Sequence, residues 1–470
     1  MSKPQIIQLN LIKSLTFLFV LLGLFFLPFN SYEGIPFLGE FSKDSCFLFF
    51  LFAFFLQILT VISLGKIKIP YKHPIFVVLM LVLLWFFLTY LLNIIDINTY
   101  YLKQTSGHKR FIRQYVSIII SSLFLFLTYY NVFSHYSVIK LFVLLRKVFL
   151  ICFIVVCVYT FIEIPIIYLG QTQLQPVLYL FDYFPFCEAW LDYKLGRISS
   201  VTYEPPAFAE YLMTIAGWMF SYIITNKGLK SFIPTVLVIT FAILSGSRSG
   251  LAIILLQFLF FLIYFIKKKK YHKSIIKIAL FLIIFIVPFL IYNSKVIYEY
   301  AEDKITSFEL DNATHSSSNQ SRFGMIYTSL KVFSNNPIKG VGFGQVAYEA
   351  RTQYPSWATK NNWEFEYKYL NDNHKPFPPS YNLYARILAE TGIIGFFIFS
   401  FFIFLCIYIS YKKIFRNRKF TWHYLVLFIS FVGFSLNWLQ IDTFRTYGFW
   451  ICLSLLIITT PNLKLKLWKK

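Results

Sequence analysis

The chain has 470 residues, of which 57% are hydrophobic, 21% are aromatic and only 14% are charged, and its mean hydropathy is +0.63. These values exclude an ordinary soluble domain and are typical of a protein with many membrane-spanning helices. The formal net charge of +23 could suggest a nucleic-acid partner. The distribution of the basic residues indicates membrane topology instead, and we expect no nucleic-acid binding.

Apolar segments of spanning length, about 20 residues, recur along the whole chain. We therefore predict an all-α, polytopic integral membrane protein with a single domain over residues 1–470 and about twelve transmembrane helices. The segments centre on Leu15–Phe29, Ser45–Leu64, Pro74–Ile94, Tyr115–Tyr130, Val148–Leu169, Ala207–Thr225, Phe232–Leu244, Leu251–Ile266, Ser274–Tyr292, Thr391–Tyr411, Phe420–Leu436 and Tyr447–Thr460.

The basic residues are divided unequally between the two sides of these spans. The loops of one side, together with both chain ends, carry 24 Lys and Arg residues, whereas the short loops of the other side carry nine. None of the 21 Asp and Glu residues lies in the basic segments. By the positive-inside rule, both termini are therefore cytoplasmic.

A polar segment, residues 293–382, lies between the ninth and tenth spans, and the charge rule makes it one large external loop. Apolar residues recur in it at helical spacing after the polar run Ser316–Ser321, and Asn335-Asn336-Pro337 is expected to end that helix. The apolar residues of this amphipathic helix are Phe323, Ile326, Tyr327, Leu330 and Phe333. A simple pore has no need of such a loop, whereas chemistry on a lipid-linked substrate does.

Aromatic residues follow in the same loop, interleaved with charged residues: Trp357, Trp363, Phe365, Tyr367 and Tyr369. Aromatic faces flanked by polar groups suit sugar rings, because the C–H faces of a sugar stack on them while its hydroxyls form hydrogen bonds. The same residues also suit packing of the loop on itself, or contact with lipid headgroups. The sequence leaves both interpretations open.

Arg248 lies in the turn between the seventh and eighth spans, within Ser245-Gly246-Ser247-Arg248-Ser249-Gly250. An arginine at this depth is costly unless it reaches water or an anion. One interpretation is that its side chain extends to the outer headgroups. The other is a functional cation, because a guanidinium fork matches two oxygens of a lipid phosphate.

Other candidate residues lie in the external segments. Arg322 begins the loop helix, where a solvated charge is also expected. Gly340-x-Gly342-x-Gly344 indicates a turn with positive φ, or backbone N–H groups that face an anion. Arg197 and Glu204 flank the start of the sixth span, and Glu204 precedes two prolines, where a residue that only fixes a turn is also expected.

The segment from Tyr381 and Asn382 to Gly392 leads from the loop into the tenth span. Arg386 and Glu390 are four residues apart, so they can pair on one helix face. Alternatively, Glu390 lies near the external end of the span and can act on a substrate hydroxyl.

The six cysteines and seven histidines are scattered, mostly within predicted spans, and no Cys-x-x-Cys motif occurs. We therefore predict no disulfide framework, no metal site and no cofactor.

At this point the chain resembles the O-antigen ligase and polymerase superfamily of bacterial envelope biosynthesis. The resemblance extends over residues 197–395 and rests on three motifs in order. Ser247-Arg248 resembles the family's Ser-Arg turn. Arg322 followed by Asn336-Pro337-Ile338-Lys339-Gly340-Val341-Gly342 resembles its Arg…His-Pro-x-x-Gly-x-Gly pattern, and Leu388-Ala389-Glu390-Thr391-Gly392 resembles its Leu-x-Glu-x-Gly motif.

One position departs from the pattern. Ligases of the family usually carry His-Asn where this chain has Tyr381-Asn382, and that histidine is thought to be the base for the incoming hydroxyl. His374, Glu204 or Glu390 could take its place. The departure, together with the segment from Arg197 to Glu204, favours a polymerase over a ligase.

The resemblance implies a membrane glycosyltransferase of the bacterial inner membrane that needs no metal. Its donor and acceptor would be undecaprenyl-diphosphate-linked glycans, polymerised at the external face into O-antigen or capsular polysaccharide. Arg248 and Arg322 would bind the diphosphate, with Arg197, Gly340, Gly342, Asn382 and Arg386 as further substrate contacts. Membrane lipids, a chain-length regulator and a flippase are the expected partners. The alternatives are a ligase that transfers glycan to lipid A core or protein, and a flippase of lipid-linked oligosaccharide.

Overall fold

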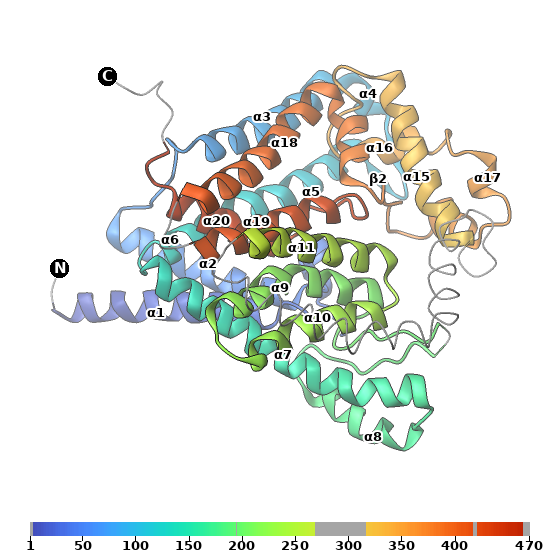
Figure 1. The fold of residues 1–470 in the computed structure, drawn as a ribbon. Helices are drawn as coiled ribbons and strands as arrows, with labels where there is room; N and C mark the ends of the chain where they lie inside the picture. Colours follow the sequence, from blue (N-terminus) through green and yellow to red (C-terminus); the bar gives the residue numbers. More distant parts are fainter. Residues whose placement is uncertain (1–2, 194, 268–315, 417–420, 464–470) are drawn as a thin grey trace.

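The computed structural model describes residues 3–193, 195–267, 316–416 and 421–463 (Figure 1). The predicted all-α membrane architecture is confirmed. Over these described ranges, the only strands are the two-residue β1 and β2, which form an antiparallel hairpin. The ninth predicted span, Ser274–Tyr292, and residues 293–315 of the predicted loop lie outside the described residues.

The first half of the chain forms these elements: α1 (Lys3–Phe25), η1 (Pro36–Phe41), α2 (Ser45–Leu64), α3 (Pro74–Leu92), α4 (Ile94–Thr99), β1 (Tyr101–Leu102), β2 (Thr105–Ser106), α5 (Gly107–Ile119), η2 (Ile120–Leu125), α6 (Phe126–Phe133), α7 (Val138–Leu169), η3 (Thr172–Leu174), α8 (Gln175–Leu178) and η4 (Tyr179–Tyr183). The second half forms α9 (Pro205–Thr225), η5 (Leu229–Phe232), α10 (Ile233–Leu244), α11 (Arg248–Lys267), α15 (Ser316–Asn335), α16 (Val346–Ala350), α17 (Ser356–Thr359), η8 (Phe365–Tyr369), α18 (Leu383–Arg416), α19 (Thr421–Asn437) and α20 (Tyr447–Thr459).

Within the described residues, seven helices are long and apolar enough to span a membrane, and four apolar helices are shorter. Together they account for each predicted span that the structure describes. Local chemistry explains several of the boundaries. Pro74 begins α3 with the fixed φ of a first helical turn, and Gly65 ends α2 in the left-handed conformation that glycine adopts without strain.

The helices share one aromatic-rich core in which α9 is the most thoroughly buried of the seven long apolar helices. Trp218, Trp438 and Trp450 are fully buried in it. In Figure 1, α1 begins and α20 ends on the left, whereas α15, α16 and α17 lie together on the right. The loop helices therefore lie at the opposite end of the helical bundle from the start of α1 and the end of α20.

The predicted loop helix is confirmed as α15, which ends at Asn335 as expected. Its apolar residues Phe323, Tyr327 and Leu330 are exposed, whereas its buried face consists mainly of small and polar residues. Close packing explains this choice, because an ideal Cβ at Gly324 would lie 2.4 Å from the Cβ of Ala358 on α17. The face that packs inward is therefore selected by size and not by hydrophobicity.

The aromatic residues of the loop divide into two groups. Phe365 and Tyr369 are buried in a small cluster with Met325 and Ala358, so they pack the loop on itself. The other three, Trp357, Trp363 and Tyr367, are exposed. Packing of the loop on itself therefore applies to the first group, whereas contact with sugars or with lipid headgroups stays a prediction for the exposed group.

Candidate functional site

The turn between α10 and α11 is fastened to the loop helix α15 by Arg248, the first residue of α11. Arg248 Nη2 donates a hydrogen bond to Oδ1 of Asn319 at 3.1 Å, and Asn319 is buried near the start of α15. The side chain therefore reaches the loop helix and does not only extend toward headgroups. The two motifs that the sequence placed about 70 residues apart thus meet in the fold.

Arg197 packs against the same turn. An ideal Cβ at Gly246 would lie 2.6 Å from Cδ of Arg197, so the arginine stem occupies the space that glycine leaves open. The guanidinium of Arg197 pairs with Asp192 at 3.1 Å, and the Ile198 N–H donates to the Leu244 carbonyl at 3.3 Å. The segment that leads to Glu204 is therefore anchored at the turn that carries Arg248.

Arg322 follows Asn319 by three residues on α15, which is about one helical turn. Its guanidinium lies 5.4 Å from the centre of the Tyr381 ring, a distance typical of a cation–π contact. Arg248, on α11, therefore contacts α15 about one helical turn before Arg322. The structure brings these two predicted residues and Tyr381 together.

Tyr381 is held in place by its hydroxyl, which shares a hydrogen bond of 2.6 Å with the Tyr369 hydroxyl. Burial raises the pKa of the Tyr381 phenol above its ordinary value, although the hydrogen bond from Tyr369 opposes this shift. At neutral pH the phenol therefore keeps its proton. It suits the role of a hydrogen-bond donor and not that of a base.

His374 lies in the loop between η8 and α18, where its carbonyl accepts a hydrogen bond of 2.7 Å from Lys103 Nζ. Lys103 occupies the tip of the β1–β2 hairpin and also binds the carbonyls of Lys368 and Asn371. Among the described residues, no partner is found for the buried Nδ1 of His374. The contacts of His374 place it with this hairpin and not with the other predicted site residues.

Glu204 precedes α9 with an extended backbone (φ −161°), and its side chain forms no capping hydrogen bond. The pKa of the neighbouring Tyr203 is raised, mainly by burial and to a smaller extent by the negative charges of Glu204 and Glu210. The Glu204 carboxylate therefore lies beside this phenol, half-buried on the segment that Arg197 anchors. Its position leaves it available for chemistry at the N-terminal end of α9.

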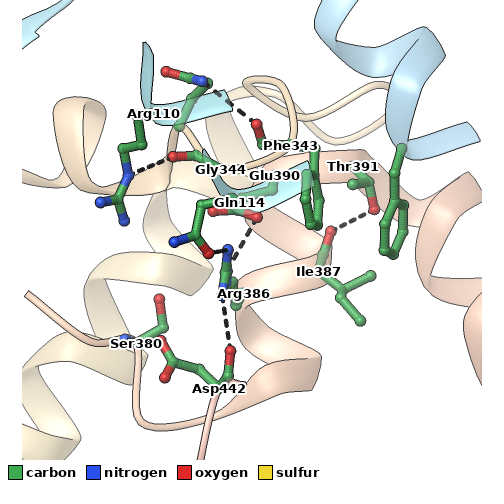
Figure 2. Close-up of polar contacts among 12 residues, drawn as sticks. Arg110, Gln114, Phe343, Gly344, Ser380, Arg386, Ile387, Glu390, Thr391 and Asp442 are labelled. Atoms are coloured by element: carbon green, nitrogen blue, oxygen red, sulfur yellow. Dashed lines mark hydrogen bonds and ion pairs between the residues drawn. The ribbon is translucent and has the colours of Figure 1, made fainter. Parts of the chain in front are cut away.

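Arg386 and Glu390 form a buried ion pair on α18, with Nε and Oε2 3.1 Å apart. Of the two interpretations that the sequence left open, this geometry favours the structural one. Glu390 is fully buried, and Arg386 is also bound by Asp442 O at 2.8 Å and Gln114 Oε1 at 3.0 Å (Figure 2). The pair therefore fixes the start of α18 through Oε2 of Glu390, while the buried Oε1 has no hydrogen-bond partner among the described residues.

The glycine motif forms a seam with α18, which corrects the expectation that its N–H groups face an anion. The Gly340 N–H donates to the Asn336 carbonyl at 3.0 Å, and the Gly342 N–H donates to the Glu390 carbonyl at 2.9 Å. Neither N–H is therefore left for a ligand. Asn382 also has a structural role, because its Oδ1 accepts the Ala385 N–H at 3.0 Å at the start of α18.

A cavity of about 700 Å³ opens beside this seam. Five cationic side chains and two carboxylates line it: Arg110, Arg113, Lys375, Arg386 and Arg445, with Glu40 and Asp442. We call it the arginine cavity. Figure 2 shows one wall, where Arg386 is bound on three sides and Arg110 Nε donates to the Gly344 carbonyl at 2.6 Å.

The loop between α19 and α20 joins the arginine cavity to the turn that carries Arg248. Gln440 contacts the Ser249 hydroxyl, next to Arg248. Two residues further on, Asp442 accepts the Ser380 N–H at 2.7 Å on its carboxylate, in addition to binding Arg386 through its carbonyl. This one loop therefore contacts Arg386 in the cavity wall and the residue next to Arg248.

A second, smaller cavity of about 180 Å³ shares Thr443 and Arg445 with the arginine cavity. Its wall includes Asp44, Glu210 and Tyr203. Arg445 pairs with Asp44 at 3.3 Å, and although burial lowers the pKa of Arg445, the carboxylate of Asp44 and its neighbours raise it above the ordinary value. Acidic and basic walls therefore adjoin at Arg445.

Residues 233–400 match the O-antigen ligase family. The matched segment includes α10, α11, α15 and the start of α18, which carry Arg248, Arg322, the glycine seam and Glu390. The match confirms the resemblance to the O-antigen ligase and polymerase superfamily, and it supports a membrane ligase or polymerase role in general. No curated protein matches the chain.

Sequence reasoning missed most of the arginine cavity. Arg110, Arg113 and Arg445 are three of the nine basic residues that the sequence places in the short loops of the sparsely charged side. That scarcity was itself a signal, because a basic residue on the sparsely charged side of a membrane protein is an exception to the positive-inside pattern. Nothing in the sequence indicated that the three would meet.

Proposed function

We propose that the protein is a membrane glycosyltransferase that polymerises oligosaccharide repeat units at the external membrane face. The donor and acceptor are undecaprenyl-diphosphate-linked glycans, and the product is O-antigen or capsular polysaccharide. One observation carries the proposal. The hydrogen bond from Arg248 to Asn319 holds one guanidinium beside the helix turn that carries the other, Arg322.

Two neighbouring guanidinium groups suit a diphosphate, because each presents forked N–H donors to pairs of phosphate oxygens. In the proposed reaction, the bond between the anomeric carbon and the diphosphate oxygen breaks, and its electron pair stays with the lipid diphosphate. Arg248 and Arg322 stabilise the charge that grows on this leaving group. The acceptor hydroxyl oxygen forms the new glycosidic bond, with inversion at that carbon.

The proton of the acceptor hydroxyl passes to a base, for which we propose Glu204. Glu390 is fully buried in its pair with Arg386, and Tyr381 keeps its proton because burial raises the pKa of its phenol. His374 contacts a different part of the loop. Glu204 is half-buried, lies beside Tyr203, and is on the segment that Arg197 anchors to the Arg248 turn.

The test is polymer length in a strain that lacks the chromosomal copy and expresses Arg248→Ala, Arg322→Ala or Glu204→Gln. A charge-assisted hydrogen bond contributes on the order of 1.5–3 kcal/mol, so each arginine variant should slow polymerisation roughly ten- to a hundredfold. Lys331→Ala is the matched control, because Lys331 is an exposed cation on the same helix as Arg322. Normal long-chain polymer from well-expressed arginine variants would contradict the proposal.

The same deletion strain separates the polymerase from its alternatives. Surface glycan limited to single repeat units indicates a lost polymerase. Polymer that stays on the carrier lipid indicates a lost ligase. Repeat units that accumulate on the cytoplasmic face indicate a lost flippase.

A further inference from the structure

The external basic residues converge on one cavity. The short external loops carry nine Lys and Arg residues, and three of them, Arg110, Arg113 and Arg445, line the arginine cavity with Lys375 and Arg386. They come from distant parts of the chain, since Arg110 binds the carbonyl of a residue 234 positions away. Like charges that line one cavity repel each other, so nearby negative charges are needed to stabilise this group of cations.

Internal ion pairs account for some of these cations. Arg386 is held by Glu390, Arg445 by Asp44 and Arg113 by Glu40, with nitrogen–oxygen distances of 3.0–3.3 Å. Arg110 and Lys375 form no ion pair with any described residue. With Asp442 also in the wall, the five cations face four carboxylates, Glu390, Asp44, Glu40 and Asp442, so the cavity keeps a surplus of one positive charge.

Arg110 gives the clearest indication that the cavity binds an anion. Only 6% of its surface is exposed, and its guanidinium stacks on Phe377 at 3.7 Å from the ring centre. Its Nε is bound to Gly344, while its two terminal nitrogens have no hydrogen-bond partner among the residues that the structure describes. Among the described residues, no carboxylate is paired with this buried guanidinium, so an anion in the adjoining cavity would stabilise it.

We propose that the arginine cavity binds an oxyanion carried by a sugar of the glycan, a carboxylate or a phosphate substituent, so that the repeat unit is acidic. This inference rests on the proposed function, because it names the substrate class of that enzyme. The volume of about 700 Å³ fits one or more sugar units, since ligand sites commonly occupy about 300–1,000 Å³.

The position of the cavity is consistent with a subsite next to the reaction centre. Arg248 and Arg322 lie at the α10–α11 turn and on α15, and the α19–α20 loop joins them to the cavity through the contact of Gln440 with Ser249. A glycan whose diphosphate is bound at Arg248 and Arg322 can therefore extend its sugars along this loop. Guanidinium forks at the far end would then select sugars that bear a negative charge.

The test uses the full-length protein in lipid nanodiscs and isothermal titration calorimetry. The probes are cellobiouronic acid, an acidic disaccharide with one carboxylate, and its neutral counterpart cellobiose. We expect the acidic disaccharide to bind roughly tenfold more tightly than the neutral one, which corresponds to one charge-assisted contact.

The variants are Arg113→Gln with Lys375→Gln, which neutralise two exposed cations of the cavity wall with little risk to folding, and Arg110→Gln. Lys360→Gln is the control, because it removes the same charge from an exposed position elsewhere in the loop. The cavity variants should weaken binding of the acidic disaccharide roughly tenfold, and the control should not. A thermal melting point close to that of the parent protein confirms that each variant is folded.

Equal affinity for the two disaccharides, including no measurable binding of either, would overturn the inference. Those results would leave the roles of Arg248 and Arg322 intact. Conversely, normal polymer from Arg248→Ala would contradict the proposed polymerase and leave the difference between the two disaccharides standing. The two failures are therefore distinguishable.

Discussion

Gly340 and Gly392 are the residues through which the loop and α18 meet backbone to backbone. An ideal Cβ at Gly340 would lie 2.4 Å from the carbonyl carbon of Glu390, and one at Gly392 would lie 2.1 Å from the Ile338 carbonyl oxygen. Both glycines also have positive φ, 67° and 66°. Because backbone atoms cannot move aside as a flexible side chain can, no side chain fits at either position.

We predict that Gly340→Ala destabilises the protein far more than the matched variant Gly170→Ala. Gly170 has nearly the same φ, 66°, but has no atom within 4 Å of an added Cβ, so the comparison isolates the steric clash from the backbone strain. Forcing a methyl group into a packed site costs about 1–3 kcal/mol. Thermal melting, monitored by tryptophan fluorescence, measures the difference. Equal melting points for the two variants would contradict the close backbone contact between Gly340 and α18.

At the residue scale, the sequence predicted local pairs and turns better than it predicted the contacts that each residue makes with distant parts of the chain. The Arg386–Glu390 pair and a turn at the glycine motif followed from spacing and residue type alone. The hydrogen bonds of the Gly340 and Gly342 N–H groups could not be predicted from the sequence. The acceptor of Gly342 is the Glu390 carbonyl, which is within reach only because α18 packs closely against the glycine motif. His374 was a candidate by its chemistry, but the position of its loop is set by the distant Lys103.

At the scale of elements, each predicted span among the described residues became a helix, because an apolar run of that length has no other way to satisfy its backbone in lipid. The inward face of α15 did not follow from the hydrophobic pattern. The exposed Phe323, Tyr327 and Leu330 are the residues that periodicity marks as apolar. The close contact between Gly324 and Ala358 decides which face of α15 packs inward. The hydrophobic pattern of the sequence gives no information about this contact.

The segment before α9 owes its position to a buried carboxylate on α7. Glu163 Oε1 and Oε2 accept the N–H groups of Ser199 and Ser200, both at 2.9 Å. These two residues follow directly after Arg197 and Ile198, which contact the α10–α11 turn. Glu163 therefore connects α7 to the segment that positions Arg197 and Glu204.

We predict that Glu163→Ala destabilises the protein and reduces polymer formation, because it leaves two buried N–H groups without an acceptor. Each unsatisfied group costs about 1–3 kcal/mol, which gives a total of about 2–6 kcal/mol. Glu163→Gln should have a smaller effect, since the amide oxygen still accepts a hydrogen bond. Glu188→Ala, an exposed acidic residue of the same external segment, is the control. A melting point of Glu163→Ala equal to that of the control would refute this role.

At the scale of the whole molecule, the arginine cavity could not be predicted, because its contacts join residues far apart in the chain. Gln114 and Arg386 are 272 positions apart, yet their side chains form a hydrogen bond of 3.0 Å. Hydropathy and charge define where each span lies but not which spans are neighbours. A single sequence therefore predicts the membrane architecture and the Arg248 and Arg322 motifs, and leaves the convergence of the external cations to the fold.

Both proposals require the arginine cavity and the loop helices to face outward, and this orientation still rests on the division of basic residues, 24 against nine. It can be tested with single cysteines in intact cells. The six native cysteines are free and buried, so they should react little with a membrane-impermeant maleimide. Lys360→Cys, in the external loop, should be labelled directly, whereas Lys227→Cys, between α9 and α10, should be labelled only after permeabilisation. The reverse pattern would place Arg248, Arg322 and the cavity in the cytosol, where no external glycan could reach them.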